Sequence, residues 1–311
     1  MMTNPVTVVF SSNDNHALLL GVALCSLLEN RRGNYPIRVF VLDGGISDKN
    51  KKRLKVLEDR YGFSITYAVP DNQVFREISS NSRPIAAYYR IAIGRLLPMD
   101  CHKVIYLDCD VIVLGDIAGL FHVDLEGKTV AAVPDQPQAE RQEHLKKMCA
   151  DIPSFVVPTG TIYFNSGVFM IDLDLWRKHE IEKKLFAFIR EHPDKLYFDD
   201  QDPLNIIFIR DKEILPGKYN FVPTPATPAI DGDPVIVHFA GGIKPWYILS
   251  ALPYQDDYVF YANKTPWKNH KYRKFMDVPF AKKYHIYRAA WWVWSAYKRM
   301  KKWFSKTLRG R

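Results

Sequence analysis

Short apolar runs rich in β-branched residues alternate with longer helical patterns along this chain. Residues 6–10 form the first apolar run, and the helical pattern of residues 17–28 follows after a polar loop. Residues 37–42 form a second run, which precedes Ser47, a favourable helix N-cap, and a charged helix that ends near Tyr61. Strands that alternate with helices in this way predict an α/β domain with a mostly parallel central sheet and helices on both of its faces.

The same periodicities locate the other expected elements. Further strands are predicted at residues 64–69, 103–107, 129–133, 167–171 and 235–239. Helices are predicted at residues 85–96 and, as one amphipathic helix, at residues 174–190. The proline-rich segments 223–234 and 245–266 are predicted to be long surface loops.

The amino-acid composition indicates a large folded body followed by a basic tail. Hydrophobic residues make up 47% of the 311 positions, which excludes disorder as the main state. The net charge is +9, but residues 280–311 contain ten Lys or Arg and no acidic residue, while the first 279 residues contain 33 basic and 34 acidic ones. The composition thus shifts sharply near Pro279, and we divide the chain into a main domain of residues 1–262 and a C-terminal segment of residues 263–311 that contains this basic stretch.

The C-terminal segment has the pattern of a basic amphipathic helix with interfacial aromatic residues. It contains Trp291, Trp292, Trp294 and Trp303, which are four of the seven tryptophans in the chain. As a helix it would carry one apolar stripe and a basic opposite side, formed by Val293, Tyr297, Met300, Phe304 and Leu308 and by Arg299, Lys302, Lys306 and Arg309. This pattern predicts docking on an anionic membrane surface. A helix packed on the main domain is the alternative, and nucleic-acid binding is disfavoured because no RNA- or DNA-binding motif accompanies the segment.

Targeting signals and cysteine usage favour a cytoplasmic location, peripheral on the inner face of the cell membrane. The first basic residue is Arg31, so no charged region precedes the short apolar N-terminal run, and the apolar pattern of residues 17–28 is too short to span a bilayer. We therefore expect neither a signal peptide nor a transmembrane helix. The four cysteines form no C-x-x-C pair, which fits a reducing compartment.

Candidate chemistry begins at Asp108-Cys109-Asp110, directly after the predicted strand 103–107. In an open parallel sheet, ligands bind at the carboxyl ends of the strands. Two carboxylates two residues apart can turn toward one cation, and such hard oxygen ligands suit Mg²⁺ or Mn²⁺ on a diphosphate better than Zn²⁺. Two solvated loop aspartates are the alternative, but the apolar residues 111–113 leave this pair as the only charges in an otherwise buried stretch.

A second polar segment follows the last predicted strand. Gly241-Gly242 offers backbone N–H groups, and Lys244 offers a cation, to a diphosphate. A surface turn with a solvated lysine is the alternative. His238 ends the apolar run 235–237, where a histidine on its own is more often a satisfied core residue than a ligand.

The chain resembles glycosyltransferase family 8 through six short blocks that occur in the order seen in that family. The blocks are Ser11-Ser12-Asn13-Asp14-Asn15, Ala87-Tyr88-Tyr89-Arg90, Tyr106-Leu107-Asp108-Cys109-Asp110, Asn165-Ser166-Gly167-Val168, Asp199-Asp200-Gln201-Asp202-Pro203-Leu204-Asn205 and His238-Phe239-Ala240-Gly241-Gly242-Ile243-Lys244-Pro245-Trp246. They span about residues 5–250 and are most similar to those of the bacterial lipopolysaccharide galactosyl- and glucosyltransferases. Six blocks in order are far more specific than any one of them.

The resemblance implies a fold, a reaction and a cofactor. It implies a GT-A nucleotide-diphospho-sugar transferase domain that moves galactose or glucose from UDP-galactose or UDP-glucose with retention of the anomeric configuration. It also implies Mn²⁺ as the cofactor, with Mg²⁺ as the alternative, and a saccharide or glycolipid acceptor that is lipid-linked or lipopolysaccharide. A nucleotidyltransferase on a similar sheet and a non-catalytic basic adaptor for membranes or nucleic acid are the competing interpretations.

Matched positions carry the family's functional residues onto this chain. The metal ligands implied are Asp108, Asp110 and His238. The donor-binding residues implied are Ser11, Asn13, Asn15, Arg90, Asp108, Cys109, Asp110, Gly241 and Lys244. The residues implied around the transferred sugar are Asp135, Asn165, Asp200 and Gln201.

Some of these positions have simpler interpretations. Many family members carry Asp where this chain has Asn13, and the first loop also fits ordinary turn chemistry. The acidic cluster 199–202 also fits a helix N-terminus rich in acids. Gln201 is a poor nucleophile and Asp200 a chemically better one, and we favour same-face attack with both residues stabilising charge on the sugar.

Overall fold

The computed structural model describes residues 5–76, 85–150, 152, 155–224, 233–247, 250 and 252–268. Its main sheet contains the strands β1 (Val6–Ser12), β2 (Ile37–Asp43), β3 (Ile65–Ala68), β4 (Lys103–Leu107), β6 (Val130–Pro134), β7 (Phe164–Asp172) and β8 (Lys212–Ile214). A small second sheet pairs β5 (Val111–Val113) with β9 (Ile236–His238). The strands predicted from the sequence are therefore all present.

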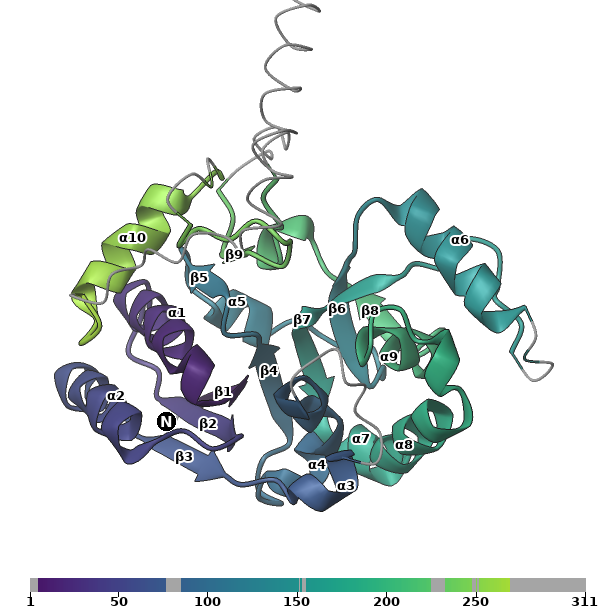
Figure 1. The fold of residues 1–311 in the computed structure, drawn as a ribbon, viewed down its shortest axis with the longest axis horizontal. Coiled ribbons are helices and arrows are strands. Elements are labelled where there is room, and N and C mark those ends of the chain that lie inside the picture. The colour runs from purple at the N-terminus through teal and green to yellow at the C-terminus, as the bar shows by residue number, and fades with distance from the viewer. Residues whose placement is uncertain are drawn as a thin grey trace, which may run out of the picture.

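The main sheet is mostly parallel, as predicted, and has the order β3-β2-β1-β4-β7-β6-β8. Only β7 runs against its two neighbours, β4 and β6. Because of this reversal, the first residues of β7 lie at the same edge as the last residues of β1, β4 and β6 (Figure 1). Polar residues from four strands can therefore meet at one edge.

Helices cover both faces of the sheet. The α-helices are α1 (Ala17–Glu29), α2 (Asp48–Tyr61), α3 (Asn72–Arg76), α4 (Ile93–Leu96), α5 (Ala118–Phe121), α6 (Gln138–Cys149), α7 (Leu173–Lys178), α8 (Ile181–Glu191), α9 (Gln201–Ile207) and α10 (Gln255–Lys264), and the short 3₁₀ helices are η1 (Asp14–His16), η2 (Ile85–Ala92), η3 (Pro193–Lys195) and η4 (Gly217–Tyr219). Figure 1 shows α1, α2 and α10 gathered at the β1–β3 end of the sheet and α6, α8 and α9 at the other end.

Alternation of side chains along the strands divides the core into two layers. In β1, Val8 and Phe10 pack on the α1 and α2 side, whereas Val9 between them packs on the side of η2, α4 and α7. In β4, Ile105 likewise faces the first layer and Val104 the second. Both faces of these strands are buried, which explains why the strands are continuous apolar runs in the sequence.

Three predictions of secondary structure were wrong in detail. Residues 85–92 form a 3₁₀ helix, and only α4 continues the predicted helix in α form. The predicted helix 174–190 is broken between α7 and α8, where Glu180 has a φ of 52° in the left-handed region. The predicted loop 245–266 contains α10, which packs on α1 through its buried Tyr258, Tyr261 and Ala262.

The last described residues pack against the main domain. Trp267 is buried, and a Cβ atom built on Gly21 of α1 would lie 2.6 Å from its ring. The residues immediately after α10 are thus packed against α1. The predicted amphipathic helix of the C-terminal segment lies outside the described residues. Among the residues that the structure does describe, each helix is too short or too polar to cross a bilayer.

Candidate active site

A cavity of about 580 Å³ opens at the edge of the sheet where the polar ends of the strands meet. Twelve of the residues singled out in the sequence line it: Ser11, Arg90, Asp108, Cys109, Asp110, Asp135, Asn165, Asp200, Gln201, His238, Gly241 and Lys244. The end of β1, the loops after β4 and β6, the start of β7 and the start of α9 supply most of them. The structure thus brings together residues that are far apart in the sequence.

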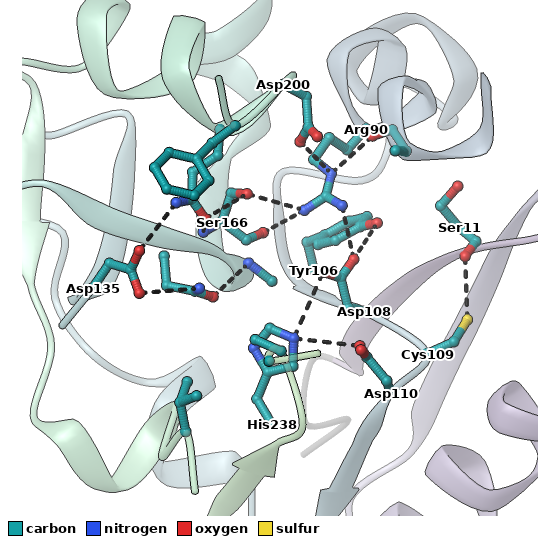
Figure 2. Close-up of a pocket in the computed structure, with 18 of the residues that line it drawn as sticks. Ser11, Arg90, Tyr106, Asp108, Cys109, Asp110, Asp135, Ser166, Asp200 and His238 are labelled. Atoms are coloured by element: carbon teal, nitrogen blue, oxygen red, sulfur yellow. Dashed lines mark hydrogen bonds and ion pairs between the residues drawn. The ribbon is translucent and has the colours of Figure 1, made fainter. Parts of the chain in front are cut away.

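Asp108, Asp110 and His238 converge on one point of this cavity (Figure 2). Asp108 and Asp110 follow β4, and the pairing of β5 with β9 sets His238 opposite Val111, next to Asp110. The His238 Nε2 atom lies 3.3 Å from Asp110 Oδ1 and 3.8 Å from Asp108 Oδ2. One ligand atom from each of the three residues falls within 4.8 Å of the others, which is compact enough to hold one cation.

The hydrogen bonds of His238 support a cation site. Asn220 donates from Nδ2 to Asn165 Oδ1 at 2.9 Å, so its Oδ1 atom is the acceptor that faces His238 Nδ1 at 3.0 Å. His238 therefore carries its hydrogen on Nδ1 when neutral, and the lone pair of Nε2 points at the two carboxylates. A lone pair facing two carboxylate oxygens is repulsive unless a metal cation, or a second ring proton on Nε2, lies between them. The residues present fit a divalent ion.

Gly167 provides the space for this arrangement. A Cβ atom at this position would lie 2.0 Å from His238 Cε1 and 2.8 Å from Asp108 Oδ2. No side chain can be accommodated there without displacing the imidazole or the carboxylate. The backbone of Gly167 also accepts a hydrogen bond of 2.7 Å from the Asp108 N–H, which fixes the Asp108 backbone against β7.

Two protein cations already balance the two aspartates. Arg90 Nη2 lies 2.8 Å from Asp108 Oδ1, and Lys244 Nζ lies 2.6 Å from Asp110 Oδ2. Burial opposes the ionisation of Asp110, but Lys244 and His238 outweigh it and hold the pKa of this carboxyl well below its usual range. The Asp110 carboxylate is therefore charged and available as a ligand at neutral pH.

Arg90 connects the cation site to the acidic segment before α9. Its guanidinium stacks 4.5 Å from the Tyr106 ring centre, and its Nε atom lies 3.0 Å from Asp200 Oδ2. Burial, together with the nearby charge of Asp108, raises the pKa of Asp200 to about 6 against the lowering effect of Arg90. Asp200 is therefore ionised at neutral pH but close to the range where it takes up a proton.

The opposite wall of the cavity is organised around Asp135 and Gln201. Gln201 Oε1 accepts a 3.0 Å hydrogen bond from the Ser166 N–H, and its Nε2 donates to Asp135 Oδ2 at 3.2 Å. Asn165 Nδ2 lies 3.5 Å from Asp135 Oδ1, and Arg141 Nε lies 2.7 Å from Asp135 Oδ2. The side chain of Gln201 is consequently held at both ends of its amide.

The first loop is arranged differently from the rest. Ser11 lines the cavity, and its carbonyl accepts a hydrogen bond from the Cys109 thiol at a distance of 3.2 Å. Asn13 uses its side-chain oxygen to cap η1 through the His16 N–H at 3.2 Å, and the Asn15 side chain is exposed. Neither asparagine lines the cavity, whereas His16 does.

Comparison with known proteins identifies the family. The chain matches Glycosyl transferase family 8 over residues 7–249. The protein belongs to glycosyltransferase family 8. It is 38% identical over 278 residues to General stress protein A of Bacillus subtilis (strain 168), covering 84% of this chain and 94% of the relative. It is 26% identical over 281 residues to a lipopolysaccharide 1,2-glucosyltransferase of Escherichia coli, covering 86% and 80%.

A solved family 8 structure has the same architecture. The crystal structure of galactosyltransferase LgtC in complex with donor and acceptor sugar analogs superposes with a TM-score of 0.75 at 28% identity, covering 85% of this chain and 99% of LgtC. The predicted GT-A fold is confirmed, and so is the prediction of a retaining hexosyltransferase. The comparisons give no support to a nucleotidyltransferase or to a non-catalytic adaptor.

Three lining residues of this family 8 site gave no usable signal in the sequence alone. Gly167 lies in a recognised block, but the need for glycine there arises from the approach of His238. Arg141 is one charged residue among many on α6, and His16 adjoins the recognised loop without belonging to it. Their roles depend on tertiary contacts that no local pattern encodes.

Proposed function

We propose that the protein transfers galactose or glucose from a UDP-sugar to a saccharide acceptor, using a divalent cation held by Asp108, Asp110 and His238. The observation that carries this proposal is the meeting of these three ligand atoms within 4.8 Å on one wall of a cavity. The opposite wall holds Gln201 and Asp135 in a hydrogen-bonded cluster. A donor can lie between a cation side that binds diphosphate and a side that contacts the hexose.

The cation side is suited to Mn²⁺. Carboxylates suit Mg²⁺ and Mn²⁺ alike, whereas the imidazole of His238 favours a transition metal, so Mn²⁺ fits the mixed set best. Such an ion supplies positive charge that stabilises the departing diphosphate. Lys244 and the backbone of Gly241 line the same part of the cavity and provide further positive groups for that diphosphate.

The sugar side supports attack on the same face as the departing UDP. The Gln201 amide is a weak nucleophile that is held by two hydrogen bonds. The Asp200 carboxylate lies 3.0 Å from Arg90 Nε and is buried, which restrains its approach to a sugar carbon. We assign Gln201, Asp200, Asp135 and Asn165 to charge stabilisation and to orientation of the hexose. An α-linked product from an α-linked donor, seen by NMR, is expected.

Relatives support the choice of sugars and acceptors. They include the lipopolysaccharide 1,2-glucosyltransferase of Escherichia coli and a lipopolysaccharide 1,3-galactosyltransferase of Salmonella typhimurium, which is 23% identical over 273 residues. We therefore propose a lipid-linked or lipopolysaccharide acceptor. The basic residues 280–311 fit this acceptor, because they would hold the enzyme on the cytoplasmic face of a membrane.

A donor screen tests the proposal. Purified protein with Mn²⁺ is incubated with a panel of UDP-sugars, and released UDP and pyrophosphate are both measured. Release of UDP from UDP-galactose or UDP-glucose, dependent on Mn²⁺, is expected. Pyrophosphate release, or UDP release that is unaffected by chelation, contradicts the proposal.

A further inference from the structure

Asp202 follows Gln201 in the sequence, but its side chain points away from the cavity. It does not line the cavity and is completely buried, with 0% of its surface exposed. A buried carboxylate is costly unless several donors satisfy it. The hydrogen-bond partners of Asp202 therefore indicate its role.

Four donors surround the Asp202 carboxylate. Its Oδ1 atom lies 2.6 Å from the Tyr163 hydroxyl and 2.8 Å from His144 Nε2. Its Oδ2 atom accepts the backbone N–H groups of Tyr197 and Phe198, each at 2.8 Å. An ionised carboxylate only accepts hydrogen bonds, so His144 carries a hydrogen on Nε2. Every partner thus stabilises the charged form.

These donors come from three parts of the fold that surround the wall formed by Gln201 and Asp135. His144 lies on α6, and Tyr163 immediately precedes β7. The two backbone donors, Tyr197 and Phe198, belong to the segment that leads into α9, and α9 begins at Gln201. One carboxylate therefore ties this segment to α6 and to the start of β7.

A second buried tie lies one turn further along α9. Asn205 accepts the Phe164 N–H at 2.7 Å and donates to the Phe164 carbonyl at 2.9 Å. Asp202 and Asn205 together fix the first turn of α9 against β7. This fixation sets the place of the Gln201 amide, which itself contacts Ser166 two residues further along β7.

We propose that Asp202, with His144, is a positioning residue that holds Gln201 in place for sugar transfer without touching the sugar. The inference rests on the proposed function of the cavity. Displacement of a reacting geometry by about 1 Å can cost roughly a hundredfold in rate. In the proposed function, the UDP moiety binds at the cation side formed by Asp108, Asp110 and His238. Loosening the contacts of Asp202 therefore lowers kcat and leaves the donor KM nearly unchanged.

Variants of His144 test the proposal because they leave the Asp202 carboxylate and the side chains of Gln201 and Asp135 chemically intact. His144→Phe and His144→Asn each remove the Nε2 donor, and His144→Gln keeps an N–H at a similar reach. We expect kcat to fall at least tenfold in the first two variants, with donor KM and the UDP affinity measured by calorimetry within twofold of wild type. His144→Gln is expected to recover most of kcat.

A matched control is His102→Phe, which removes an exposed histidine that pairs with Asp174 at 2.9 Å on the surface. It is expected to change neither constant. Unchanged kcat in a folded His144→Phe or His144→Asn variant overturns the proposal, as does a loss of UDP affinity equal to the loss of kcat. A hexose covalently attached to Asp202, found by mass spectrometry of the reacting enzyme, also overturns it.

A separate measurement distinguishes failure of this inference from failure of the proposed function. Hydrogen exchange at the amides of Tyr197 and Phe198 is expected to be faster in His144→Phe than in wild type, whether or not any UDP-sugar is a substrate. If wild type releases UDP from no sugar, the proposed function fails while this readout still tests the tie. If exchange is unchanged, the tie fails by itself.

Discussion

Gly167 lies at the start of β7, where the imidazole of His238 passes over its Cα atom. The surrounding strands fix both backbones, because Asp108 hydrogen-bonds to Gly167 and His238 is paired with Val111. Neither backbone can retreat from an added methyl group without breaking strand pairing. The geometry of the cation site therefore depends on the absence of a side chain at one position.

Gly167→Ala is accordingly expected to fold but to bind Mn²⁺ at least tenfold more weakly. The added Cβ would lie 2.0 Å from His238 Cε1, so the imidazole must leave its place. Titration of the protein with Mn²⁺, followed by electron paramagnetic resonance, measures the affinity. Gly217→Ala is the matched control, since a Cβ there meets nothing within 4 Å. Wild-type affinity in Gly167→Ala contradicts the site.

Asp110→Asn removes one anionic ligand and the partner of Lys244. If the substitution weakens stabilisation of the transition state by about 4 kcal/mol, the rate of UDP release falls roughly a thousandfold. Steady-state kinetics with and without a chelator measure the effect. Full activity of the variant in the presence of chelator would remove the basis for assigning a metal here.

Helix α1 shows how packing between elements brings the end of the described chain onto the domain. The Trp267 ring fills the space above Gly21, and the Arg53 guanidinium of α2 lies 5.6 Å from its centre. One ring thus joins α1, α2 and the residues after α10. The absence of a side chain at Gly21 allows this approach.

Trp267→Ala is expected to lower the free energy of unfolding by about 3 to 5 kcal/mol, the usual cost of truncating a buried large aromatic residue. Urea denaturation followed by circular dichroism measures the change. Phe260→Ala on α10 is the control, because Phe260 is 54% exposed and little packing is lost. Equal stability of the two variants contradicts the assigned packing.

Elements with continuous apolar runs were predictable, and elements defined by tertiary contacts were not. The runs that became β1, β2 and β4 are buried on both faces, so their sequences carry an unambiguous signal. Helix α10 has no such signal, because its three buried residues share one short run, 258–262, with the exposed Val259 and Phe260, in a segment flanked by prolines. The break at Glu180 comes from a left-handed backbone that its sequence does not require.

The candidate site divides in the same way. Asp108, Asp110 and His238 were found because short motifs mark them and a family resemblance gives them roles. The contact between His144 and Asp202 joins residues 58 positions apart, and although Asp202 lies in a recognised block, no sequence pattern marks His144 as its partner. Such a pair becomes visible only when α6 and α9 are placed in space.

The whole molecule consists of a nearly neutral body and a basic tail, and we expect the tail to determine where the enzyme acts. Basic residues near an anionic membrane contribute ~1 kcal/mol each, so engagement of half of the tail's basic residues supplies ~5 kcal/mol. A chain that stops before Phe280 is expected to leave anionic vesicles in a sedimentation assay and to keep its hydrolysis of UDP-sugar. Equal vesicle binding by the two proteins refutes docking, and aggregation of the shorter one favours a tail packed on the domain.

The pairing of each cavity aspartate with a protein cation has a consequence for the speed of donor capture. Charges of opposite sign are nearly balanced among the lining residues Arg90, Arg141, Lys244, Asp108, Asp110, Asp135 and Asp200. A UDP-sugar that enters the cavity as its complex with the divalent ion also carries little net charge. Long-range attraction therefore contributes little to their encounter, and the association rate constant is expected to change less than threefold between about 0.02 and 0.5 M salt. Stopped-flow measurement of UDP-sugar binding at several salt concentrations, with Mn²⁺ present, checks this weak salt dependence. The rate of donor capture then depends on short-range contacts that form after the donor has reached the cavity.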